Sequence, residues 1–259
     1  MVEGWRGAGV DLSGAFAIRP SGRSVEGLRV VADLTDAGPE PSLVILGFKP
    51  QQLQEVAPEL SLRITSGTTV LSILAGIEGA VLRRHFPNAA AIVRAVPNLP
   101  VAIRRGVIGL YSPDAADEMR QQLSQLFATL GYTVWTHREE NLGPLGAVAG
   151  AGPAYVARFV DALAKAGVAR GLSEELARTV ALETVLGTAW MAAAQRLGMD
   201  ELVRRIASPN GTTEAGLSVL ERENVFDQLI AVTINASVRR GAEIADQARS
   251  LSSPQENSP

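Results

Sequence analysis

The stretches Leu43-Val-Ile-Leu-Gly-Phe48 and Thr69-Val-Leu-Ser-Ile-Leu74 are apolar almost throughout, and neither alternates between apolar and polar positions. Continuous apolar runs of this length are typical of parallel strands that are buried on both faces. Similar runs and intervening helical patterns fill the first half, which predicts an α/β doubly wound sheet of the Rossmann type. The other predicted strands are residues 15–18, 28–31 and 90–96, and the predicted helices are residues 51–60, 77–85 and 115–130.

The second half has a different character, with long Ala-rich helical patterns and no convincing strand from about Gly143 onward. Ser173 is a predicted helix cap, because Glu174 and Glu175 follow it in the favoured first-turn positions. The other predicted helices are residues 155–169, 200–207, one that starts at Thr212–Thr213, and 226–249. We therefore expect a Rossmann-type domain over residues 1–138, an all-helical domain over 139–250 and a disordered tail over 251–259.

Composition excludes several classes of function. The 259 residues have a net charge of -3 and an aromatic content of 5%, which argues against nucleic-acid binding. The chain has no cysteine and only two histidines, so we expect no disulfide, no metal site and no Cys or Ser–His nucleophile. The N-terminus lacks the pattern of a signal peptide, and no apolar run reaches membrane-spanning length. A cytoplasmic protein is the expectation.

The segment Ser208-Pro-Asn-Gly-Thr-Thr213 is a small-residue loop that leads into a helical pattern. A helix start offers unpaired N–H groups and the positive end of a dipole, so it attracts anions. Three hydroxyls and no bulky side chain surround this start, which suits a small carboxylate. The alternative is that Thr212 or Thr213 simply caps the helix. Gly150-Ala-Gly-Pro-Ala-Tyr155 is a second loop of this kind.

Two of the predicted helices are apolar over more than one face, namely the one after Ser173 and the one over residues 226–249. Such a helix needs more partners than its own small domain supplies. This predicts an intertwined homodimer.

Five short motifs, in order along the chain, resemble those of the Δ1-pyrroline-5-carboxylate reductases, which make L-proline with NADPH. They are Lys49-Pro50, Ser72-Ile-Leu-Ala-Gly76-Ile77, Arg94-Ala-Val-Pro97-Asn98-Leu-Pro100, Gly150–Tyr155 and Ser208–Gly216. The resemblance implies a Rossmann-type domain followed by a helical dimerisation domain, with dimers that assemble further into rings. It also implies hydride transfer from a nicotinamide to a cyclic imine that carries one carboxylate.

By this resemblance, substrate binding falls to the second domain, and Thr213 is the best candidate to protonate the imine nitrogen or hold a water there. Its alternative role is helix capping. Glu139 either lines the substrate site or caps the incoming helix. The implied substrate-binding residues are Glu139, Ser208, Gly211, Thr212 and Thr213.

The cofactor is expected at the carboxyl ends of the strands, where open α/β sheets bind ligands. Arg19, Ser21 and Arg23 follow a strand without an acidic residue, which favours NADPH over the alternative NADH. A solvated basic turn is the competing interpretation. The other predicted cofactor-binding residues are Lys49, Pro50, Ser72, Ala75, Gly76 and Asn98, the last of which either binds the nicotinamide carboxamide or builds a turn.

The chain departs from the family pattern at its start, because no strand with a Gly-x-Gly-x-x-Gly-like phosphate turn precedes residues 15–18. We expect that the natural protein is longer; the alternative is a defective or rearranged sheet. Ala151, Asn210 and Leu99 also replace the family's Ser, Gly and Thr. Two rival interpretations remain: a β-hydroxyacid dehydrogenase-like oxidoreductase, for which Lys165 is poorly placed, and a non-enzymatic dimeric binding protein.

Overall fold

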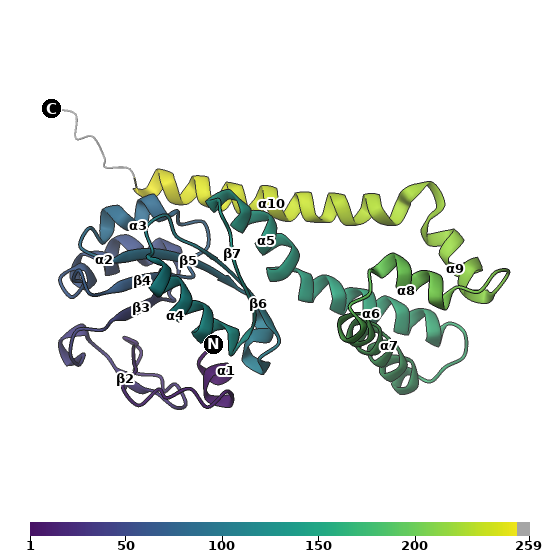
Figure 1. Ribbon diagram of the computed structural model, residues 1–259, viewed down its shortest axis with the longest axis horizontal. Helices are drawn as coiled ribbons and strands as arrows, with labels where there is room; N and C mark the ends of the chain where they lie inside the picture. Colours follow the sequence, from purple (N-terminus) through teal and green to yellow (C-terminus); the bar gives the residue numbers. More distant parts are fainter. Residues whose placement is uncertain (253–259) are drawn as a thin grey trace. The chain divides into compact units, whose positions relative to one another are not determined.

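The computed structural model describes residues 1–252 and divides into two compact units (Figure 1). The first unit contains residues 1–151 together with the returning segment 236–252, and the second contains residues 152–235. The first compact unit thus includes residues 139–151, and the domain boundary near residue 139 stays a prediction. Residues 253–259 of the predicted disordered tail lie outside the described residues.

The first unit contains two sheets. A parallel pair consists of β1 (Phe16–Ile18) and β2 (Arg29–Val31). A five-stranded sheet has the order β3-β4-β5-β6-β7, in which only the β5–β6 pairing is antiparallel. Its strands are β3 (Leu43–Leu46), β4 (Thr69–Ser72), β5 (Ala91–Pro97), β6 (Gly106–Tyr111) and β7 (Gly131–Trp135). In the described part of the chain β1 and β3 share no neighbouring strand.

Helices connect and cover these strands. The α-helices of the first unit are α1 (Val2–Gly7), α2 (Leu53–Ser61), α3 (Gly79–His85), α4 (Asp117–Ala128) and α5 (Leu142–Leu145). Short 3₁₀ helices are η1 (Leu34–Asp36), η2 (Pro50–Gln52), η3 (Leu99–Ile103) and η4 (Glu139–Asn141), and η5 (Gly146–Gly150) is a π-helix. The predicted helices over residues 51–60, 77–85 and 115–130 correspond to α2, α3 and α4.

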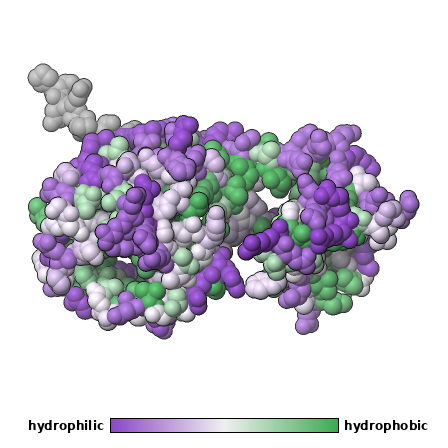
Figure 2. Space-filling model, viewed as in Figure 1, coloured by the Kyte–Doolittle hydropathy of each residue, from purple (hydrophilic) through white to green (hydrophobic). Residues whose placement is uncertain are grey.

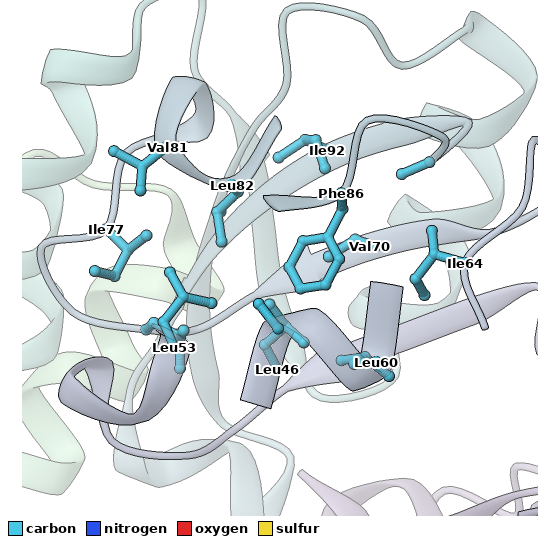
Figure 3. Packing of buried hydrophobic residues seen from close by; sticks show 13 residues of the cluster. Leu46, Leu53, Leu60, Ile64, Val70, Ile77, Val81, Leu82, Phe86 and Ile92 are labelled. Atoms are coloured by element: carbon cyan, nitrogen blue, oxygen red, sulfur yellow. The ribbon is translucent and has the colours of Figure 1, made fainter. Parts of the chain in front are cut away.

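The core explains why the strands are apolar throughout. Val70 and Leu71 are neighbours on β4 and point to opposite faces of the sheet, yet neither is exposed. Val70 belongs to a cluster with side chains of α2 and α3, around the fully buried Phe86 (Figure 3). Leu71 belongs to a second cluster with Phe127 of α4. Helices therefore pack on both faces of the sheet, which confirms the doubly wound prediction.

Strands β6 and β7 are missing from the sequence-based prediction. Both begin with glycine and β6 contains a second one, and glycine is depleted in strands. Their pairing requires glycine at position 131, where φ is +143° and an added Cβ would collide with the carbonyl oxygen of Gly106. The close approach of two backbones is a tertiary requirement that a search for apolar runs does not detect.

The second unit contains helices joined by turns and no strand within residues 152–235. Its helices are α6 (Gly152–Val168), α7 (Glu174–Gln195), α8 (Met199–Ile206), α9 (Thr212–Leu220), the 3₁₀ helix η6 (Arg222–Asn224) and the first part of α10 (Val225–Ser252). Ser173 caps α7 as predicted, since its Oγ accepts a hydrogen bond from Leu176 N at 3.3 Å. Few side chains of this unit are buried, and apolar surface, drawn green, interrupts its polar surface (Figure 2). None of the described helices combines the length and the apolar character that crossing a bilayer requires.

Candidate functional site

The carboxyl ends of three parallel strands lie side by side at one edge of the large sheet. In the register of the sheet, Leu46 of β3 is level with Ser72 of β4, and Ser72 is level with Arg94 of β5. The predicted cofactor-binding residues Lys49, Ser72 and Asn98 follow at or just beyond these strand ends. The structure therefore brings them to the same edge, the position where open α/β sheets bind ligands.

The loop after β4 has a defined conformation. Ser72 is only 2% exposed, and its Oγ accepts a hydrogen bond from Leu74 N at 3.2 Å. Gly76 has a left-handed backbone (φ +75°), and an added Cβ would lie 3.0 Å from Ala245 N of α10. The hydroxyl of Ser72 thus shapes the turn from inside, whereas Ala75 presents exposed surface at the tip.

The loop after β3 presents a cation. The backbone N–H of Lys49 donates to Gln52 Oε1 at 3.1 Å, and Pro50 begins the short helix η2. The Lys49 side chain is exposed and its ammonium group has no hydrogen bond or ion pair with residues 1–252. It is therefore available to an anionic ligand.

The hydrogen bonds of Asn98 differ from the predicted contact with a nicotinamide. Its Nδ2 donates to the carbonyl oxygen of Ala149 at 2.9 Å, and its Oδ1 accepts from Val107 N at 2.8 Å. Both ends of the amide are thus engaged by backbone. The structure favours the turn-building alternative, in which Asn98 ties the end of β5 to β6 and to η5.

Glu139 contacts two residues of the first unit. Its Oε1 accepts a hydrogen bond from Gly79 N at 2.7 Å and forms an ion pair with Arg94 Nη1 at 2.8 Å. Gly79 is the first residue of α3. Glu139 therefore caps a helix 60 residues earlier in the chain, and does not cap the helix that follows it. Its predicted contact with substrate stays a prediction.

Arg94 was not among the predicted site residues, although it begins the motif Arg94–Pro100. It lies in the middle of β5, level with Ser72 at the end of β4, and 14% of its side chain is exposed. An arginine within an otherwise apolar strand indicates a nearly buried charge. Such a charge requires a partner, so the sequence offered a reason to single out Arg94. The sequence did not identify Glu139 as that partner.

The turn after β1 carries two unpaired guanidinium groups. Arg19 accepts a hydrogen bond from Gly22 N at its carbonyl oxygen, and Gly22 has a φ of +64°, so residues 19–22 form a tight turn. Ser21 Oγ is 3.5 Å from Arg23 N. Neither Arg19 nor Arg23 has a side-chain partner among residues 1–252, which leaves their charges available to an anionic ligand.

The Ser208–Thr213 loop belongs to the helical unit and is exposed. The N-cap of α9 is Gly211, and no side chain caps this helix. The capping alternative for Thr212 and Thr213 is therefore wrong. An added Cβ at Gly211 would lie 2.6 Å from Ser208 Oγ, so a larger residue there would force the Ser208 hydroxyl to move.

The start of α9 is consequently open. The first three N–H groups of the helix, from Thr212 to Glu214, have no acceptor among the described residues. The hydroxyls of Ser208, Thr212 and Thr213 also have no partner in the described part of the chain. The Glu214 carboxylate accepts from Asn210 N at 2.7 Å and so occupies one further N–H of the loop.

Gly150–Tyr155 does not form a second open helix start. Residues 146–150 are the π-helix η5, and the Ala151 N–H donates to the Gly146 carbonyl oxygen at 3.1 Å. The N–H group of Ala151 is therefore used by a helical hydrogen bond. This segment makes a helical connection instead of an anion site.

Comparisons with known proteins agree with the motifs. Residues 139–244 match the family model for pyrroline-5-carboxylate reductase dimerisation. The pyrroline-5-carboxylate reductase of Pseudomonas aeruginosa is 35% identical over 219 residues, which cover 84% of this chain and 80% of that protein. The chain belongs to the pyrroline-5-carboxylate reductase family. The Aquifex aeolicus member is 31% identical over 84% of this chain and 81% of its own length.

Solved structures support the fold. A pyrroline-5-carboxylate reductase from Coxiella burnetii aligns with a TM-score of 0.79 at 29% identity, over 85% of this chain and 82% of that one. The Plasmodium falciparum pyrroline carboxylate reductase, solved with NADP bound, aligns with a TM-score of 0.82 at 23% identity, over 94% and 92%. These findings confirm the predicted family, the Rossmann-type fold class and an oxidoreductase activity. The dimerisation segment supports homo-oligomerisation.

Proposed function

We propose that this chain reduces 1-pyrroline-5-carboxylate to L-proline with NADPH, the last step of proline biosynthesis. The observation that carries the proposal is the open start of α9, with exposed hydroxyls on both sides of Gly211. We also propose that residues 1–138 bind the cofactor, and that residues 139–250 bind the imino-acid substrate and form the homodimer. Assembly of dimers into a ring is part of the same proposal.

The α9 start suits the substrate carboxylate. Three free N–H groups and the positive end of the helix dipole favour one negative charge. The hydroxyls of Ser208 and Thr212 donate further hydrogen bonds to the carboxylate oxygens, and the absence of a Cβ at Gly211 leaves the Ser208 hydroxyl in place beside the helix start. A bound carboxylate fixes the ring of a small imine, and orientation of this kind accelerates a reaction without a strong acid or base.

Reduction of the imine requires a proton at nitrogen as well as a hydride at carbon. Thr213 is the proposed source of that proton, directly or through a water that its hydroxyl holds. The exposed Thr213 hydroxyl has no partner among the described residues, so it is free to serve this role.

The residues present fit NADPH at several points. Lys49 and the β4–α3 loop line the carboxyl edge of the large sheet, and Arg19 and Arg23 offer two charges after β1 that no described residue pairs. A guanidinium pair of this kind suits a 2′-phosphate. When bound, NADPH supplies the hydride that reduces the imine carbon.

Reversing both charges after β1 tests the cofactor assignment. The double substitution Arg19→Glu with Arg23→Glu is expected to weaken NADPH binding about 100-fold, because two charge-assisted hydrogen bonds are lost. NADH lacks the 2′-phosphate, so its affinity should change less than about threefold. Fluorescence titration measures both constants. Equal losses for the two cofactors would show that the turn is only a solvated basic turn.

The activity itself is tested by NADPH oxidation with 1-pyrroline-5-carboxylate as substrate. The proposal expects saturable kinetics in both reactants and L-proline as product. A chain that binds no NADPH would support the rival interpretation of a non-enzymatic dimeric protein. A chain that oxidises a β-hydroxyacid with NADP⁺ and leaves the imine unreduced would support the dehydrogenase-like rival.

A further inference from the structure

The loop between β4 and α3, residues 73–78, is held by residues far away in the sequence. Gly76 packs directly on the backbone of Ala245 in α10. Glu78, at the end of the loop, forms an ion pair with Arg249 of α10, and Glu78 Oε1 lies 2.8 Å from Arg249 Nη1. Helix α10 thus supports the loop from one side.

A second support holds the end of the loop, where α3 begins. Glu78 is the N-cap of α3 but its side chain does not cap the helix. The Glu139 carboxylate supplies the missing acceptor for Gly79 N, and the same oxygen is held by Arg94. With 27% and 14% of their side chains exposed, Glu139 and Arg94 are shielded from water, so their pairing is stronger than that of a surface ion pair.

The position of this contact gives it consequences for ligand binding. The supported loop includes Ala75 and Gly76, and it follows Ser72 at the carboxyl end of β4. A binding loop that is already held in its bound conformation loses less conformational entropy on binding. Removal of the support should therefore weaken ligand binding at the loop while the protein stays folded.

We infer that Glu139 is a positioning residue for the cofactor-binding loop, which it holds through Gly79 while Arg94 fixes its carboxylate. The inference rests on the proposed function, in which residues 72–76 bind NADPH. It assigns Glu139 a role toward the cofactor that differs from the substrate contact expected from the sequence.

The test compares Glu139→Ala and Glu139→Gln with Glu140→Gln, a matched control whose carboxylate pairs with the exposed Arg138. Glu139→Ala is expected to raise the dissociation constant for NADPH about tenfold, because the carboxylate that caps α3 and holds the loop is lost. The dissociation constant of Glu139→Gln should lie between those of Glu139→Ala and the unsubstituted chain. Its amide oxygen still accepts a hydrogen bond from Gly79 N, but the neutral amide no longer forms an ion pair with Arg94. Glu140→Gln should match the unsubstituted chain.

Two further measurements separate positioning from general damage. Hydrogen exchange of the cofactor-free protein should become faster in residues 73–82 of Glu139→Ala and stay unchanged in the helical unit. The KM for NADPH should rise while the KM for the imine stays within about twofold of the unsubstituted value. Unchanged NADPH binding in Glu139→Ala, or an equal rise of both KM values, overturns the inference. Absence of NADPH binding in the unsubstituted chain overturns instead the proposed function on which it rests.

Discussion

Replacing Thr213 with alanine is expected to lower kcat about 100-fold, the lower end of the range for a positioned proton donor. Because the Thr213 hydroxyl does not cap α9 and has no partner within residues 1–252, its removal should cost little stability. The dissociation constant for NADPH should not change, since Thr213 and the proposed cofactor residues belong to different compact units. Steady-state kinetics, a cofactor titration and a melting curve measure the three quantities.

Ser218→Ala is a suitable control for this prediction. Ser218 lies on the same helix, but its hydroxyl donates to the Ala215 carbonyl oxygen one turn earlier. Its kcat should therefore equal that of the unsubstituted chain. If Thr213→Ala also turns over normally, Thr213 has no part in protonation and the donor must be sought elsewhere.

Charged substitutions on α7 are expected to break the oligomer. Leu182 and Leu186 lie one helical turn apart on α7 and are 56% and 55% exposed, so the two side chains present neighbouring apolar surface. Burial of both in each subunit of a homodimer would contribute several kcal/mol, about 1.5–3 for each fully buried leucine. Leu182→Asp with Leu186→Asp should therefore weaken self-association at least about 100-fold, since the new carboxylates would also have to be desolvated.

Sedimentation velocity at micromolar concentration tests this expectation. The unsubstituted chain should sediment as a dimer or a larger assembly, and the double variant as a monomer. Arg170→Glu changes charge in the exposed turn between α6 and α7 and should leave the assembly intact. A monomeric unsubstituted chain, or a double variant of unchanged mass, would contradict the proposed interface.

Continuous apolar runs predicted β1 to β5. The physical reason is clearest in β4, where the neighbours Val70 and Leu71 are buried on opposite faces of the sheet, so consecutive positions are apolar. Ser173 and the two glutamates after it predicted the start of α7 for an equally local reason. By contrast, β6 and β7 depend on a backbone approach between Gly106 and Gly131, which no local pattern records.

Some features of the candidate site could likewise be predicted from local sequence, and others could not. The Ser208–Thr213 segment was identified from its own residues, since its hydroxyls and its glycine lie within six positions. The roles of Asn98 and Glu139 could not be read this way, because their partners, Ala149 for one and Gly79 and Arg94 for the other, are 45 to 60 residues away.

The sequence by itself determined the α/β half, the helical half, the family and the loop that leads into α9. Each depends on interactions within a few residues or on motifs that are preserved in order. Only the tertiary structure decided that Gly211 occupies the N-cap position of α9 and leaves the helix start open. It also decided that Asn98 binds backbone groups and that Glu139 supports the loop after β4. The physical reason is that a polar side chain binds whichever donor or acceptor the folded chain brings within about 3 Å of it.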